Sequence, residues 1–167
     1  MRVVVDALGA PTGTGGMRTY VEELVAAWSA AYPDDALLVV GYAYVADLAS
    51  TNVRPVVLPE SALARVLGQW VWSGLRARAW RADVLVSAST VVSPLFPRRR
   101  RLCVIHDWRH LERPEEFGRL QRAYRRLWEW SATRAAHAVQ ISPKTLAESR
   151  ARLPRATMTL VENGRDH

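Results

Sequence analysis

Short runs of apolar residues alternate along the chain with longer segments in which apolar and polar positions repeat at helical spacing. Seven runs rich in Val, Leu and Ile predict buried strands, because their apolar residues are nearly continuous rather than alternating. The predicted strands are residues 2–8, 37–43, 54–58, 83–87, 102–105, 138–141 and 158–161.

Four amphipathic helices are predicted between these runs. The clearest follows the first strand, where Met17, Val21 and Trp28 belong to one apolar stripe and Pro33 ends the helix. A second helix is expected over residues 63–80. Its large apolar residues are expected to face the core, namely Leu63, Val66, Leu67, Trp70 and Leu75.

A third helix is predicted over residues 119–136, with an apolar stripe facing inward and four arginines on the opposite side. The stripe consists of Leu120, Ala123, Tyr124, Leu127 and Ala135. The arginines are Arg119, Arg122, Arg125 and Arg126. A fourth helix is predicted from Ser142 to about Pro154, because serine is a favoured N-cap and Pro143 would be its first residue.

Strands that alternate with helices of this length predict an α/β fold. We expect a Rossmann-like, mostly parallel sheet of about seven strands with helices on both faces. In such sheets ligands bind beyond the carboxyl ends of the strands. Residues that directly follow a strand are therefore the first candidates for chemistry.

The glycine-rich segment after the first strand is one candidate site. It contains Gly9, Gly13, Gly15 and Gly16, which let the backbone approach a ligand closely. A helix that begins near Gly16 would present free N–H groups, as phosphate or carboxylate sites do. A glycine turn that only connects strand and helix is the alternative. Arg18 replaces the third glycine of a dinucleotide fingerprint, and no P-loop lysine follows.

Two further candidates follow later strands. His106 and Asp107 follow the fifth strand, and a neutral imidazole there would hydrogen-bond a ligand hydroxyl or transfer a proton. The alternative is a histidine bound to a backbone carbonyl. The segment 108–117 is expected to be a polar loop. Ser142 follows the sixth strand, where a helix cap is the simplest function and a ligand contact the second.

The distribution of charge and the single cysteine limit which partners and which covalent links are expected. Residues 1–60 carry three arginines and seven acids, a balance of −4, whereas residues 61–167 carry twenty bases and nine acids, a balance of +11. This asymmetry is typical of a protein with an anionic partner, and a bias toward arginine codons explains it equally well. The single cysteine, Cys103, excludes an intramolecular disulfide and is expected to be buried and inert. No metal site is expected.

Five short motifs, in this order, resemble the N-terminal half of a family 4 glycosyltransferase with the GT-B fold. They are Gly15-Gly16, His106-Asp107, Arg-Pro-Glu-Glu-Phe at 113–117, Ile-Ser-Pro at 141–143 and Leu-Val-Glu-Asn-Gly-Arg-Asp at 160–166. The resemblance implies that a sugar is transferred, with retention, from a nucleotide-diphosphate sugar to an acceptor, without a metal or other cofactor. It covers essentially the whole chain.

The resemblance also implies roles for parts of the chain. Residues 1–160 would form the acceptor-side domain, and residues 161–167, with Asn163 and Gly164, would begin a hinge to a second, donor-binding domain. Gly15 and Gly16 would lie beside the donor phosphates, and His106 would be catalytic at the donor sugar. The expected acceptor or cleft contacts are Arg18, Tyr20, Asp107 and Ser142.

The same resemblance sets expectations about partners. These are a nucleotide sugar, a carbohydrate or lipid-linked acceptor and the second domain, and no nucleic acid. The arginines of 98–101 and 119–126 face either solvent or an anionic membrane or acceptor. With no apolar run near 20 residues and no signal peptide, a cytoplasmic protein is expected, with or without peripheral contact at the inner membrane face. Without the second domain, negligible transferase activity and weak donor affinity are expected.

Two other function classes remain open. A nucleotide- or NAD-binding Rossmann domain of an oxidoreductase would share this fold, but Gly41 and Tyr42 stand where an acid would bind the ribose. A non-catalytic module that binds anions or nucleic acid would use the arginines and some of the seven tryptophans. NADH binding would favour the first class, and salt-dependent binding to random DNA the second.

Overall fold

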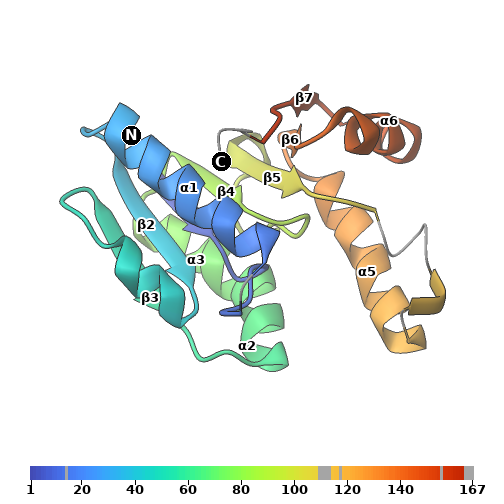
Figure 1. Cartoon of the computed structure of the whole chain (residues 1–167), viewed down its shortest axis with the longest axis horizontal. Coiled ribbons are helices and arrows are strands. Elements are labelled where there is room, and N and C mark those ends of the chain that lie inside the picture. Colours follow the sequence, from blue (N-terminus) through green and yellow to red (C-terminus); the bar gives the residue numbers. More distant parts are fainter. Residues whose placement is uncertain (14, 109–113, 117, 155, 164–167) are drawn as a thin grey trace.

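The computed structural model describes residues 1–13, 15–108, 114–116, 118–154 and 156–163. Within these ranges seven parallel strands form one sheet in the order β3-β2-β1-β4-β5-β6-β7 (Figure 1). The strands are β1 (Arg2–Asp6), β2 (Ala36–Gly41), β3 (Val53–Val57), β4 (Val84–Ser87), β5 (Arg101–Ile105), β6 (His137–Gln140) and β7 (Met158–Leu160). All seven predicted strands and their parallel arrangement are confirmed.

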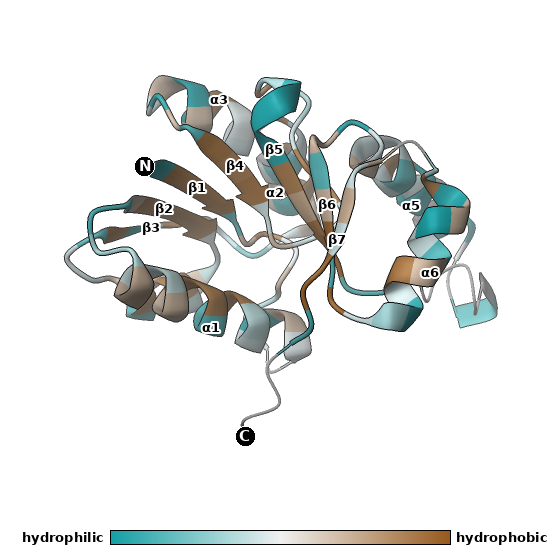
Figure 2. Ribbon diagram, turned by 90° about the horizontal axis from the view of Figure 1, so that it is seen from above, coloured by the Kyte–Doolittle hydropathy of each residue, from teal (hydrophilic) through white to brown (hydrophobic). Residues whose placement is uncertain are grey.

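Helices connect these strands and cover the sheet. The longer ones are α1 (Gly16–Ala31), α2 (Ala62–Leu67), α3 (Ser73–Ala79), α5 (Arg119–Ala132) and α6 (Pro143–Arg152). A π-helical turn, η2 (Gly68–Trp72), joins α2 to α3. Short 3₁₀ turns are η1 (Ala43–Leu48), η3 (Arg98–Arg100) and η4 (Pro114–Glu116). Seen from above, α1 lies on one side of the sheet and α3 on the other (Figure 2).

The core sits on both faces of the central strands, as continuous apolar runs predict. Val3, Val4 and Val5 of β1 are all fully buried, and so are Leu37 and Leu85 on the neighbouring strands. β1 pairs in parallel with β2 on one side and β4 on the other. The sheet therefore fixes where the carboxyl ends of β1, β4 and β5 lie relative to one another.

The inward face predicted for residues 63–80 is wrong at three of its five large apolar residues, while Val66 and Trp70 are half-buried. Leu63, Leu67 and Leu75 are exposed, with relative accessibilities of 68, 52 and 51%. The buried positions are small or polar instead, namely Gly68, Gln69, Ser73, Gly74 and Ala77. The physical reason is close packing: a Cβ at Gly74 would overlap the Ser93 side chain, and one at Gly68 would overlap Leu8.

The side assignment of α5 is only partly right. Arg119, Arg122 and Arg126 are exposed, as predicted. Leu127, expected inside, is 48% exposed, and Arg125, expected in solvent, is half-buried over the Trp128 ring. The reason is that α5 packs against η2 as well as the sheet, as the hydrogen bond from Trp70 to Tyr124 shows.

Candidate functional site

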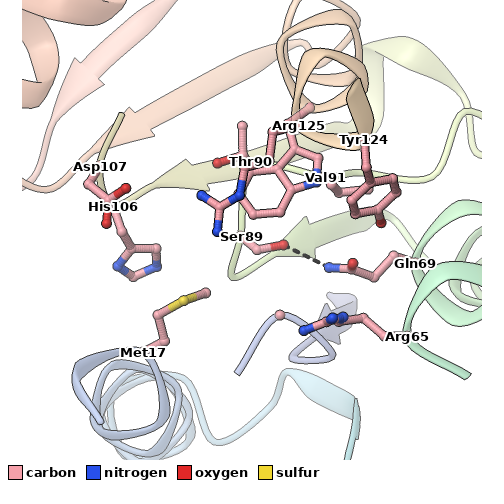
Figure 3. Close-up of a pocket in the computed structure, with 12 residues that line it drawn as sticks. Met17, Arg65, Gln69, Ser89, Thr90, Val91, His106, Asp107, Tyr124 and Arg125 are labelled. Carbon is pink, nitrogen blue, oxygen red and sulfur yellow. Dashed lines mark hydrogen bonds between the residues drawn. The ribbon is translucent and has the colours of Figure 1, made fainter. Parts of the chain in front are cut away.

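A pocket opens at the carboxyl edge of the sheet, where β1, β4 and β5 end (Figure 3). Segments after these strands and residues of α1, α2, η2 and α5 line it. The lining residues are Gly9, Met17, Arg65, Gln69, Ser89, Thr90, Val91, His106, Asp107, Tyr124, Arg125 and Trp128. The sheet thus gathers residues up to 119 positions apart in sequence into one concave, solvent-open site of the kind that binds small ligands.

His106 is held at this edge by one defined hydrogen bond. Its Nε2 lies 3.0 Å from the carbonyl oxygen of Ala88, the residue that follows β4. Burial lowers the pKa of His106 below 6.5, against opposing effects of the Ala88 hydrogen bond and Asp107, so the ring is neutral at pH 7. A carbonyl only accepts, so Nε2 carries the proton and Nδ1 is left as an acceptor.

Two residues of α1 lie near His106: Tyr20 packs against its ring, and Met17 lines the pocket. Tyr20 lies with its ring perpendicular to the His106 ring, with centroids 5.0 Å apart. Burial raises the pKa of Tyr20, so its hydroxyl is neutral. Met17, one turn earlier, lines the pocket itself. Met17 of α1 and the His106 imidazole therefore line the same pocket, whereas Gly15 and Gly16 are not among its lining residues.

In the glycine-rich segment, Thr12 is held by hydrogen bonds, whereas Gly15 and Gly16 are exposed. The N–H of Thr12 donates to the Glu60 carboxylate at 3.2 and 3.3 Å, and its carbonyl accepts from Arg18 at 2.7 Å. Gly15 is the N-cap of α1 and Gly16 its first residue; both are exposed, and a Cβ on either would meet nothing within 4 Å. Internal packing thus gives no reason for these two glycines.

Arg18 is not among the residues that line the pocket with His106. Its Nε donates to Glu22 at 2.7 Å, and its guanidinium stacks 5.1 Å from the centroid of the Tyr44 ring. Together with the contact to Thr12, these interactions make it an anchor of the glycine-rich segment. An acceptor contact from Arg18 therefore stays a prediction.

Asp107 and Ser142 occupy different positions relative to the pocket. Asp107 is exposed and lines it. Ser142 caps α6 by accepting from the N–H of Thr145 at 3.1 Å, as predicted. The Thr145 hydroxyl in turn donates to the His106 carbonyl at 3.2 Å. Ser142 is therefore linked to His106 only through Thr145, and it does not line the pocket.

Several lining residues were not predicted from the sequence. Gln69 donates to the Ser89 hydroxyl at 2.9 Å, and both side chains are buried. Ser89 and Thr90 follow β4, so the rule that selected His106 applies to them too. Arg65 and Arg125 bring two positive charges from helices, and no sequence signal separates them from the solvent-facing arginines.

Some predicted residues lie outside the described part of the chain. These are Gly164, the rest of the hinge after it, and positions 109–113 and 117 of the predicted polar loop. Asn163 is described and exposed. Among the described residues, no three His, Cys, Asp or Glu side chains gather as a metal site would require. No described helix combines the length and apolar character needed to span a bilayer.

Comparison with known proteins identifies a fold relative. No family model matches the chain, and no curated protein matches it. Among solved structures, the chain is similar to Anabaena Alr3699/HepE, determined in complex with UDP and glucose, with a TM-score of 0.58 and 16% sequence identity. The match covers 99% of this chain and 45% of HepE, so the chain spans less than half of that protein. The similarity confirms the Rossmann-like α/β fold.

Proposed function

We propose that the chain is the N-terminal, acceptor-side domain of a retaining glycosyltransferase of the GT-B type. The observation that carries the proposal is the pocket where His106, Asp107 and the start of α1 meet at the carboxyl edge of the sheet. The fold similarity to HepE, which binds UDP and glucose, supports a nucleotide sugar as donor. Residues 161–167 would begin the crossing to a second α/β domain that completes the cleft.

His106 is the proposed contact to the reacting sugar. Because Nε2–H is engaged by Ala88, Nδ1 is the atom that accepts a hydrogen bond from a sugar hydroxyl. Protonation would turn Nδ1 into a donor, so that it could no longer accept the proton of the sugar hydroxyl. Since burial lowers the pKa of His106, transfer is expected to persist until the pH falls below 6.5.

The diphosphate of the donor is proposed to lie against the diglycine. The first N–H groups of α1 have no partner within the helix, and the helix dipole favours an anion there. Gly15 and Gly16 leave the approach to these groups open. Arg65 and Arg125, together with the second domain, would offset the negative charge that develops on the leaving nucleotide. The proposed transfer therefore uses no metal ion.

Hydroxyls of a carbohydrate acceptor are proposed to bind Asp107, Gln69 and Thr90. These side chains combine acceptors and donors, as sugar hydroxyls require. The Gln69–Ser89 hydrogen bond would hold the carboxamide in a fixed orientation. Tyr20 is proposed to act indirectly, by packing on His106, and Ser142 by capping the helix that touches it.

The test is a transfer assay on the complete gene product that contains this chain, with a panel of nucleotide sugars that includes UDP-glucose. We expect release of the nucleotide, and a product with the anomeric configuration of the donor. His106→Gln is expected to lower kcat/KM by about 10- to 100-fold, because a hydrogen bond to substrate is lost inside the pocket.

His137→Gln is the matched control. This histidine lies at the start of β6, and its Nε2 is hydrogen-bonded to Thr159 at 2.6 Å, away from the pocket. It should leave the transfer rate unchanged. Failure of every nucleotide sugar to react would contradict the proposal, and tight NADH binding would favour an oxidoreductase. Steady turnover by the 167 residues alone would contradict the need for a second domain.

A further inference from the structure

Arg101, the first residue of β5, is a buried arginine whose guanidinium lacks hydrogen-bond acceptors. The residue is only 7% exposed, and its Nε and Nη1 have no acceptor in the described part of the chain. The sheet holds the residue inside, because Arg101 pairs in register with fully buried Leu85 and its carbonyl accepts from the N–H of Ala136 at 2.8 Å. The expectation that residues 98–101 face solvent or an anionic surface is therefore wrong for Arg101.

Two exposed arginines, Arg98 and Arg134, bring further positive charge to the same place. Burial lowers the pKa of Arg101, and the charges of Arg98 and Arg134 lower it further. Arg98 donates to the carbonyl of Thr133 and Arg134 to that of Trp130, both at 3.4 Å, and Arg134 also stacks 3.8 Å from the Trp130 ring centroid. Among the described residues, no carboxylate forms an ion pair with any of the three guanidiniums. We call Arg98, Arg101 and Arg134 the arginine cluster.

The arginine cluster lacks both hydrogen-bond acceptors and negative charge. Buried charges in proteins are normally paired, and buried N–H groups normally have acceptors. An ordered water would accept hydrogen bonds from Arg101, but it would leave three like charges close together. An oxyanion supplies acceptors and charge at once, and a phosphate group does so with several oxygens and a charge of about −1.5 to −2 at pH 7.

We propose that the arginine cluster binds the phosphate group of a small soluble molecule. Arg101 would donate to it from the buried side, and the exposed side chains of Arg98 and Arg134 would close over it from the surface. The burial of Arg101 is what favours a small ligand. An extended anionic surface would be met by the exposed arginines alone, and it would give no reason for an unpaired guanidinium inside the fold.

This site is separate from the pocket, so the inference does not depend on sugar transfer. Arg101 begins β5 and His106 follows its last residue, which places the two side chains about 16 Å apart along the strand. The arginine cluster therefore lies at the amino edge of the sheet, and the pocket lies at the carboxyl edge.

The experiment is a titration of the chain with inorganic phosphate at constant ionic strength, followed by calorimetry and by the NMR resonance of the Arg101 Nε–H group. We expect binding and a shift of that resonance. Arg101→Met keeps a side chain of similar length without the charge, and it is expected to lower phosphate affinity at least about tenfold. Arg98→Gln and Arg134→Gln should each lower it by up to about fivefold, because their side chains are exposed.

The Arg101→Met variant is expected to stay folded, because an apolar side chain in place of a buried charge is often neutral or stabilising. Thermal unfolding checks this. Arg150→Met is the matched control, since Arg150 is exposed on α6, and it should leave phosphate affinity unchanged. A parallel titration with glycerol 3-phosphate distinguishes the two sources of the group. Tighter binding than inorganic phosphate would identify a phosphate ester as the ligand, and weaker binding would identify free phosphate.

The absence of any shift of the Arg101 resonance with phosphate or its ester would overturn the proposal, and this readout needs no variant. Equal phosphate affinity of Arg101→Met and the wild type would also overturn it, because binding would then be a property of the exposed arginines alone. Binding to random DNA without a response to either phosphate compound would overturn it as well, and would assign the arginine cluster to nucleic acid.

Discussion

Asp6 is a buried carboxyl at the end of the first strand. It ends β1, is fully buried, and accepts a hydrogen bond from the N–H of Leu8 at 3.1 Å. Burial raises the pKa of its carboxyl to about 6, although the Leu8 hydrogen bond opposes the shift.

Asp6 should make stability depend on pH in a defined direction. Between about pH 4 and pH 6 the folded chain holds the proton and the unfolded chain does not, so the free energy of unfolding falls as the pH rises. The expected loss is about 3 kcal/mol across this window. Asp6→Asn keeps an acceptor for Leu8 but cannot ionise, so its urea-unfolding curves should lack that loss. Parallel pH profiles for the two proteins would contradict the assignment.

At the same scale, the sequence predicted only some of the site. His106 and Asp107 could be selected because they directly follow a buried strand, and Ser142 because it precedes proline at a helix start. Ser89 and Thr90, which follow β4, satisfy the same criterion. Arg65 and Arg125 could not be predicted, because which side of a helix an arginine faces depends on how that helix packs.

At the scale of elements, close packing decides which side of a helix is buried. The α2–η2–α3 segment turns its glycines, Ser73 and Ala77 inward, where a helix dominated by leucine would be expected to bury leucine. Helical periodicity predicted that a helix exists over these residues, and it gave the wrong face. The strands were predicted more accurately because a strand buried on both faces needs no choice of side.

Gly74→Ala tests this packing. Alanine is favoured over glycine in a helix by about 1 kcal/mol, but here its Cβ would overlap Ser93, whose hydroxyl donates to the Trp70 carbonyl at 2.8 Å. We expect a net loss of about 1–2 kcal/mol in the free energy of unfolding. Gly13→Ala, where a Cβ meets nothing within 4 Å, is the control and should cost far less. Equal stability of the Gly74 variant and wild type would show that α3 has room to move.

At the scale of the whole molecule, the parallel sheet determines where the candidate site lies. Its seven strands share a direction, so every strand end that carries polar residues meets the same edge. The pocket lies at this edge, lined by residues that follow β1, β4 and β5 and by residues of α1, α2, η2 and α5.

Cys103 reports on the integrity of this sheet. It is fully buried in β5, and burial raises the pKa of its thiol to about 12. In the native protein it should therefore resist a thiol reagent at pH 8, and its modification rate should follow the fraction of unfolded chain as urea is added. Rapid labelling without denaturant, at a rate independent of stability, would mean that β5 opens on its own.

The central claim is that the diglycine and His106 form one ligand-binding surface. The most direct measurement is an NMR titration of the isotope-labelled chain with UDP-glucose, and separately with simple sugars, at millimolar concentrations suited to weak binding. We expect the resonances of Gly15, Gly16 and the His106 imidazole to shift together, while those of Val71 and Leu75, which do not line the pocket, stay in place. Shifts confined to any other surface, or no shift with any sugar or nucleotide sugar, would contradict it.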